Sequence, residues 1–291
     1  MGWEDAFEQR QRIVLTSTEL IAMGATSHLL TAAVRGGYLI RARRDHYVLP
    51  DTPRSIVEAV RVGGRVTCIS RLALAGIFAE DVRFTHIHMA ETMSRSRSPR
   101  ARHIPLTQHN RDGIELHWWP ISGPPQRALV SITDALSHAL RCQDPTRALA
   151  SIDNAVFQKA ITPDHVPAIF RAAPQRLAWL EPYVDGRAES GQETVLRMLV
   201  LSLGLRCEVQ VEMPGIGRVD LVVEGCLVLE ADSRMAHDGW EHHVVDRGRD
   251  LSVAVLGFMS LRPAYQHTMH EPELVKAAIR NLVAEHKQFR T

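Results

Sequence analysis

The stretch Gly217–Arg262 constrains the fold of this chain most, because acidic residues interrupt what would otherwise be plain core strands. Two short apolar runs, Val219–Val223 and Cys226–Leu229, flank the pair Glu224-Gly225. Short apolar runs around a two-residue turn containing glycine are typical of a tight β-hairpin. The sequence therefore predicts a hairpin here, followed by a helix and a further strand.

Carboxylates lie on and beside this hairpin: Asp220 on the first run, Glu230 and Asp232 at the end of the second. Burying a carboxylate without a partner is costly, and Mg²⁺ or Mn²⁺ is a common partner for such clusters. Alternatively, the carboxylates face solvent on an edge strand and pair with Arg218 or Arg234. Spacing alone leaves both interpretations open.

The same segment resembles the endonuclease-like domain related to very-short-patch-repair endonucleases, within the restriction-endonuclease-like (PD-(D/E)xK) group. The resemblance covers about residues 190–283. Its motif positions are Glu193, Gly217-Arg218-Val219-Asp220, Glu230-Ala231-Asp232-Ser233, His237, Asp246-Arg247-Gly248-Arg249-Asp250, Leu251, Gly257-Phe258 and Arg262. Ser233 replaces the usual glycine, and Asp232 stands where many nucleases of the wider group carry lysine.

The resemblance implies a metal-dependent site that cleaves phosphodiesters. Asp220, Glu230 and Asp232 are the expected ligands of Mg²⁺ or Mn²⁺, and Glu193 reaches in from the preceding helix. His237 is expected to orient or deprotonate the attacking water. Arg247 and Arg249 are expected to bind phosphate, or else to pair with Asp246 or Asp250 at helical spacing.

The first 50 residues predict a winged helix-turn-helix. Helices are expected over residues 4–12, after the capping sequence Thr16-Ser17-Thr18-Glu19, and from residues 25–27 through Arg35. A hairpin pairing residues 38–40 with 47–49 follows as the wing. In such modules the third helix enters the major groove and the wing contacts the DNA backbone. Some winged-helix modules bind protein instead.

This stretch also resembles the N-terminal domain of AbiE-type antitoxins of type IV toxin–antitoxin systems, through Thr16, Glu19-Leu20, Gly24, Ser27, Leu30, Ala33-Val34-Arg35, Gly37, Leu39, Arg41-Ala42 and Tyr47-Val48-Leu49. Those antitoxins bind operator DNA and repress their own expression. The residues expected to contact DNA are Ser27, His28, Thr31 and Arg35 on the helix, and Arg41, Arg43, Arg44 and His46 in the wing.

The whole chain is therefore expected to be an α+β and α/β multidomain protein. The predicted domains are a winged helix-turn-helix (residues 1–52), an α/β middle domain (53–184) and a restriction-endonuclease-like α/β sandwich (185–291). The order of helix, strand, hairpin, helix, strand and helix places a mixed sheet inside the last domain. Actinobacterial proteins that the chain resembles as a whole share this order of domains.

Charge is distributed unevenly although the net charge is only +1. Residues 1–110 hold 15 Arg and no Lys against 10 acidic residues, and the remainder holds 19 basic against 23 acidic residues. A basic N-terminal part favours phosphate contact. The four cysteines lack disulfide or metal-ligand spacing, so we expect reduced thiols, no structural zinc site and a cytoplasmic protein. No apolar run approaches the length of a transmembrane helix, so we expect no membrane contact.

Two functions remain in competition. One is a metal-dependent DNA endonuclease targeted by its winged helix. The other is an antitoxin or transcriptional repressor whose nuclease-like domain is inert and serves to form a homodimer or to bind a cognate toxin. Retention of the polar motif positions favours the first, and Ser233 with the missing lysine favours the second.

Overall fold

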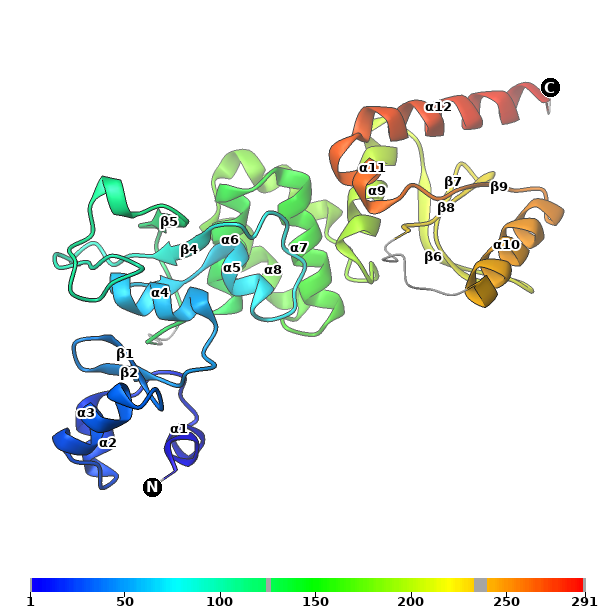
Figure 1. Cartoon of the computed structure of the whole chain (residues 1–291). Helices are drawn as coiled ribbons and strands as arrows, with labels where there is room; N and C mark the ends of the chain where they lie inside the picture. Colours follow the sequence, from blue (N-terminus) through cyan, green and yellow to red (C-terminus); the bar gives the residue numbers. More distant parts are fainter. Residues whose placement is uncertain (1, 124–126, 233–239, 290–291) are drawn as a thin grey trace. The chain divides into compact units, whose positions relative to one another are not determined.

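The computed structural model describes residues 2–123, 127–232 and 240–289. The chain forms two compact units: residues 1–142 with 171–174, and residues 143–170 with 175–291. Each unit mixes helices with β-strands (Figure 1). The expected α+β multidomain class is therefore confirmed. The finer division into 1–52, 53–184 and 185–291 places its boundaries elsewhere and stays a prediction.

The N-terminal elements follow the predicted order. They are α1 (Trp3–Arg10), α2 (Ser17–Ala22), α3 (Ser27–Arg35), β1 (Ile40–Arg43) and β2 (His46–Val48). Thr16 and Glu19 form a reciprocal capping box at the start of α2, and Thr26 caps α3. Strands β1 and β2 pair antiparallel, and Leu15 forms an isolated bridge with Tyr47. The segment between α1 and α2 is thus attached to the hairpin through this single bridge.

The rest of the first unit surrounds a small sheet. Its elements are α4 (Arg54–Val62), β3 (Arg65–Val66), α5 (Cys68–Ala73), β4 (Thr85–His88), η1 (Gln108–Asn110), β5 (Ile114–His117) and α6 (Ile132–Cys142). Strand β4 pairs antiparallel with β3 and parallel with β5. Ile87 of β4 packs with Ile56 and Val60 of α4 in an apolar core. Because side chains alternate along a strand, His86 and His88 point to the opposite face of the sheet.

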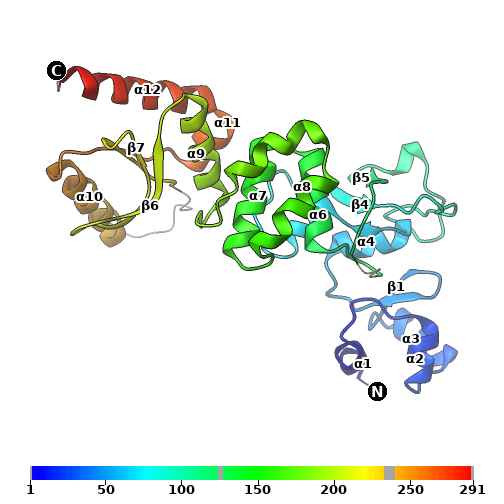
Figure 2. The same cartoon turned by 180° about the vertical axis from the view of Figure 1, so that it is seen from behind.

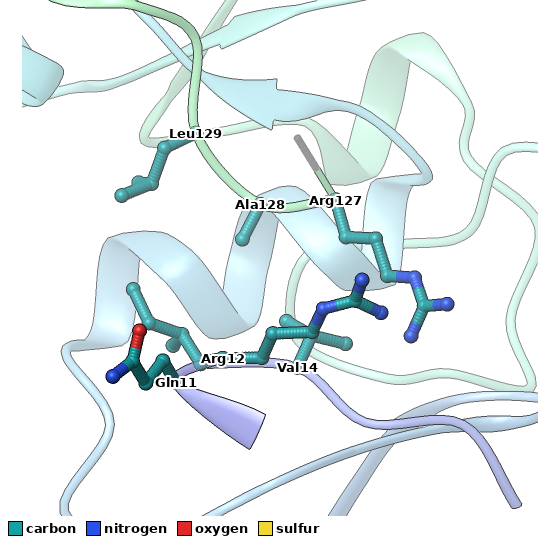
Figure 3. A pocket seen from close by; sticks show the side chains of 7 residues that line it. Gln11, Arg12, Val14, Arg127, Ala128 and Leu129 are labelled. Atoms are coloured by element: carbon teal, nitrogen blue, oxygen red, sulfur yellow. The ribbon is translucent and has the colours of Figure 1, made fainter. Parts of the chain in front are cut away.

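A hollow of about 530 Å³ lies between the linker after α1 and residues 127–129 (Figure 3). Arg12 and Arg127 line it, and their guanidinium groups converge because both bind the carboxylate of Glu19. Glu19 therefore caps α2 and also ties residue 127 to the helical module. The hydrogen bond from Arg127, with those from Thr16, lowers the pKa of Glu19 to about 2.

Glu19 is expected to make the first unit sensitive to acid. The pKa of the Glu19 carboxylate lies near 2 in the folded protein and at 4.5 ordinarily, so its ionised form stabilises the fold at pH values above 4.5. This stabilisation is lost as the pH falls through about 2. Glu19→Gln can still close the capping box but loses the ion pairs with Arg12 and Arg127, so it should lower the free energy of unfolding at pH 7 by about 0.4–2 kcal/mol and flatten the acid limb. Urea unfolding between pH 2 and 7 measures both effects. Glu8→Gln, at an exposed position of α1, is the control, and equal acid limbs in the two variants would contradict the assignment.

The chain beyond residue 142 begins with helices and continues into a second sheet. The elements are α7 (Pro145–Phe157), η2 (Pro163–His165), α8 (Val166–Ala172), η3 (Gln175–Tyr183), α9 (Gly191–Ser202), β6 (Cys207–Met213), β7 (Gly217–Val223), β8 (Leu227–Leu229), α10 (Trp240–Val255), β9 (Met259–Leu261), α11 (Tyr265–His270) and α12 (Pro272–Phe289).

The second sheet has the order β6-β7-β8-β9, in which only β8 and β9 run parallel. The hairpin between β7 and β8 is the predicted one: Glu224 and Gly225 both have positive φ, which tight hairpin turns require. Leu196 of α9 and Ile279 of α12 belong to the core on one face of the sheet, and Val253 of α10 to the core on the other. Figures 1 and 2 show this layer of strands between α9 with α12 and α10.

None of the described helices combines the length and the apolarity that crossing a bilayer requires.

Candidate functional site

Two carboxylates meet across the β7–β8 hairpin. Since Leu221 pairs with Leu229, the antiparallel register places Asp220 opposite Glu230, one residue further along. The Oδ2 atom of Asp220 accepts a hydrogen bond of 2.8 Å from the amide of Ala231. Glu230 is buried and Asp220 is half-buried. The hairpin therefore brings together two of the three predicted metal ligands.

Burial makes these carboxylates reluctant to ionise. It raises the pKa of Asp220 and the pKa of Glu230, and the negative charge of Asp220 raises the pKa of Glu230 further. The pKa of Glu193 is raised by the same two causes, burial first and then Asp220. A nearby positive charge favours the ionised form of each of the three carboxylates.

Arginines supply part of that charge. Glu230 forms ion pairs with Arg262, at 2.6 Å, and with Arg249, at 3.0 Å. Arg249 also donates to the carbonyl oxygen of Arg218, which anchors α10 to β7. The predicted phosphate ligand Arg249 is thus half-buried against Glu230. Arg247 is exposed and pairs with Asp250 at 3.0 Å, the helical alternative that its spacing allowed.

Asp232 does not join Asp220 and Glu230, and the carboxylate of Glu193 is bound by other groups. The side chain of Asp232 is exposed, while its backbone forms an isolated bridge with Ala264. Over the described part of the chain, Asp220, Glu230 and Asp232 are not gathered at metal-ligand distance. Glu193 accepts hydrogen bonds from the amides of Glu189 and Ser190, and from the side chain of Gln210. It closes the capping box of α9, so its carboxylate has a structural role beside Asp220.

His237, the predicted general base, lies outside the described residues, as do Ser233 and Arg234. Its role stays a prediction.

The predicted DNA-binding face of α3 is open to solvent. Ser27, His28, Thr31 and Arg35 are all exposed, and Thr31 donates to the carbonyl of Ser27 one turn earlier. Three of the four follow one ridge of the helix at intervals of four residues. The helix therefore presents polar side chains to solvent on the face where the DNA contacts are predicted.

Some side chains of the wing are exposed to solvent, and others contact neighbouring residues of the protein. Arg44 is exposed at the hairpin turn, and its carbonyl contacts the Nδ1 atom of His46 at 3.0 Å. Arg41 lies over the ring of Tyr47. The prediction that Arg43 contacts DNA phosphates is not supported by the position of its side chain. Its guanidinium donates to the carbonyl oxygens of Arg61, Val62 and Arg95, so it points into the unit.

Sequence reasoning missed two groups of residues. One is the buried ion pair of Asp153 and Arg197, which joins α7 to α9. The other is a set of cysteine and histidine side chains in the first unit, Cys68, His86, His117 and Cys142. The members of each group come from elements far apart in the chain, so no local spacing reveals them.

Comparison with known proteins adds no relative: no family model matches the chain, and no curated protein matches it significantly.

Proposed function

We propose that the protein binds duplex DNA through α3 and the β1–β2 wing, and that its second unit hydrolyses phosphodiester bonds at Asp220 and Glu230. The observation that carries the catalytic part is the pairing of these two carboxylates across the hairpin, where burial raises the pKa of each. Two such carboxylates side by side repel each other when ionised, and the ion pairs of Glu230 offset this only in part, because the pKa of each group stays raised. A site that recruits a cation explains their presence.

The donor set fits Mg²⁺ or Mn²⁺, which prefer carboxylate oxygens. Asp220 and Glu230 would hold the ion. Bound there, a divalent ion would polarise a phosphate oxygen and acidify a bound water. The chain itself contributes Arg249 and Arg262, which form ion pairs with Glu230. Their guanidinium groups could also bind the phosphates of a DNA backbone.

DNA binding is supported by the exposed face of α3 and by the excess of arginine in residues 1–110. The wing is held in place by Asp45, whose carboxylate accepts hydrogen bonds from the amide and hydroxyl of Ser17 at the start of α2. Arg44, next to this anchor, is exposed and placed to contact a phosphate.

Arg44→Ala is expected to weaken binding to all DNA sequences about equally and to lower the slope of log K against log salt by about 1, because one phosphate contact is lost. Arg43→Ala should leave that slope unchanged and destabilise the fold instead, because Arg43 binds three backbone carbonyls. Fluorescence anisotropy at several salt concentrations measures the first effect, and thermal unfolding the second. A slope that responds to Arg43→Ala but not to Arg44→Ala would overturn this division of the wing.

The second candidate function is a DNA-binding repressor with an inert nuclease-like unit, which would bind a cognate toxin or a second copy of itself. One observation favours it: both carboxylate oxygens of Glu230 are already ion-paired with arginines, and a cation must compete with these guanidinium groups. Incubation of supercoiled plasmid with the protein and Mg²⁺ or Mn²⁺ tests the two functions. Nicking supports the endonuclease. Intact plasmid together with tight binding to its own promoter supports the repressor.

A further inference from the structure

Four metal-ligating side chains converge in the first unit, away from the carboxylates. Cys68 is the first residue of α5, His86 lies on β4, His117 ends β5, and Cys142 ends α6. One ligand atom from each, a sulfur or a ring nitrogen, lies within 4.8 Å of the other three. The expectation that the cysteines form no metal site considered only their spacing in the sequence, and the fold brings two of them together with two histidines.

The separations between the ligand atoms lie close to those of a tetrahedral site. The Nδ1 atom of His86 lies 2.9 Å from the Nε2 atom of His117 and 3.6 Å from the sulfur of Cys142. With Zn–S near 2.3 Å and Zn–N near 2.0 Å, tetrahedral geometry separates two nitrogens by about 3.3 Å and a nitrogen from a sulfur by about 3.5 Å. Adjustments of a few tenths of an ångström would therefore admit an ion.

The backbone holds Cys68 in an unusual conformation. Its φ is +50°, in the left-handed region that residues with a side chain rarely adopt. Such a conformation is strained and persists where the surroundings impose it, often at functional sites. Thr67, the preceding residue, contacts the Nδ1 atom of the buried His138 at 2.7 Å, which holds this end of α5 in place.

The ligands are also held from outside. The ring of His117 stacks on Trp119 with centroids 4.2 Å apart. Ser70 accepts a hydrogen bond from the amide of His86 and donates to the carbonyl of Phe84. These contacts fix the ring plane of His117 and the backbone at His86. Cys68, His86 and His117 are buried, whereas Cys142 is exposed, so an ion can enter from its side.

We propose that Cys68, His86, His117 and Cys142 bind one Zn²⁺ that links α5, β4, β5 and α6. Two thiolates and two imidazoles form a donor set typical of structural zinc. Mg²⁺ and Mn²⁺, expected at Asp220 and Glu230, prefer oxygen ligands, so the two sites differ in the ion they take. Zinc would stabilise the first unit by binding the folded state alone.

The test is the metal content of the full chain, purified without chelator and measured by inductively coupled plasma mass spectrometry. We expect about one zinc per chain, in keeping with a four-ligand site. Co²⁺ added to the metal-free protein should give the intense visible absorption of tetrahedral cobalt with thiolate ligands. Cys142→Ser should lose both signals and melt at a lower temperature in the presence of zinc.

Cys207→Ser is the matched control, because Cys207 is a free thiol of the second unit and far from the four ligands in the chain. It should keep the zinc and the cobalt spectrum. Because Cys142 is exposed at the end of a helix, its replacement leaves the core intact, and a native circular dichroism spectrum verifies this. Metal-free protein that stays spectroscopically silent with Co²⁺ would overturn the proposal, as would a disulfide between Cys68 and Cys142 in protein purified without reductant. Plasmid nicking does not enter this test, so failure of the zinc site and failure of the nuclease are distinguishable.

Discussion

Asp220→Asn is expected to abolish plasmid nicking in Mg²⁺ or Mn²⁺, by about 10²–10⁴-fold, since a metal supplies several kcal/mol of transition-state stabilisation and each 1.36 kcal/mol is tenfold in rate. The substitution removes a charge and keeps the shape. Its side-chain oxygen can still accept the hydrogen bond from the amide of Ala231. Loss of nicking therefore reports on the charge at this position and not on the hairpin.

Asp220→Asn should lose activity without losing thermal stability. Burial raises the pKa of Asp220, which means that the folded protein disfavours its ionised form. In the absence of divalent ions, Asp220→Asn should therefore melt at or above the temperature of the wild type. A functional residue commonly shows this exchange of stability for activity. The measurement is thermal unfolding with and without Mn²⁺, which should raise the melting temperature of the wild type only.

Glu208→Gln is the matched control for Asp220→Asn, because Glu208 is an exposed carboxylate on β6 of the same sheet. It should nick DNA like the wild type. Nicking by Asp220→Asn at the wild-type rate would exclude the carboxylate pair as the catalytic centre. His237→Ala is expected to abolish nicking too, with metal affinity retained, because a group that acts on the water contributes mainly in the transition state.

Local patterns in the sequence predict the helices and strands of the N-terminal module and the hairpin at Glu224-Gly225. Thr16 with Glu19 and Thr26 are capping residues, and each determines where its helix begins. The direction in which a long side chain points depends on residues that are distant in the sequence. Arg43 was expected to face DNA, but the end of α4, 18 and 19 residues further on, offers carbonyl oxygens that it binds instead.

Long-range contacts explain what the sequence could not predict. The sequence predicts a domain boundary before residue 185, yet the amide of Asp185 donates to Asp153 of α7 within the second unit. The zinc ligands are separated by 18, 31 and 25 residues and belong to four elements, so no cysteine or histidine motif appears. The carboxylates could be predicted as a group because Asp220 and Glu230 share one hairpin, whereas Asp232 lies past the end of its strand.

Asp153 of α7 and Arg197 of α9 form a buried ion pair, with side chains 0% and 8% exposed and atoms 2.8 Å apart. Asp153 also accepts hydrogen bonds from Thr194 and from the amide of Asp185, and Arg197 donates to the carbonyl of Tyr183. The pair therefore joins α7, the segment before α9, and α9 itself.

Arg197→Met is expected to lower the free energy of unfolding of the second unit by about 3–5 kcal/mol, because it leaves the Asp153 carboxylate buried without its cation. The double variant Arg197→Met with Asp153→Asn should recover part of this loss, since no charge is then left unpaired. Urea unfolding followed by tryptophan fluorescence measures these effects. Arg206→Met is the control, because the ion pair of Arg206 with Glu224 is 3.5 Å long and its arginine is 88% exposed, and exposed pairs contribute about 0–1 kcal/mol. If Arg197→Met cost no more than Arg206→Met, the buried pair would not be what holds α7 on α9.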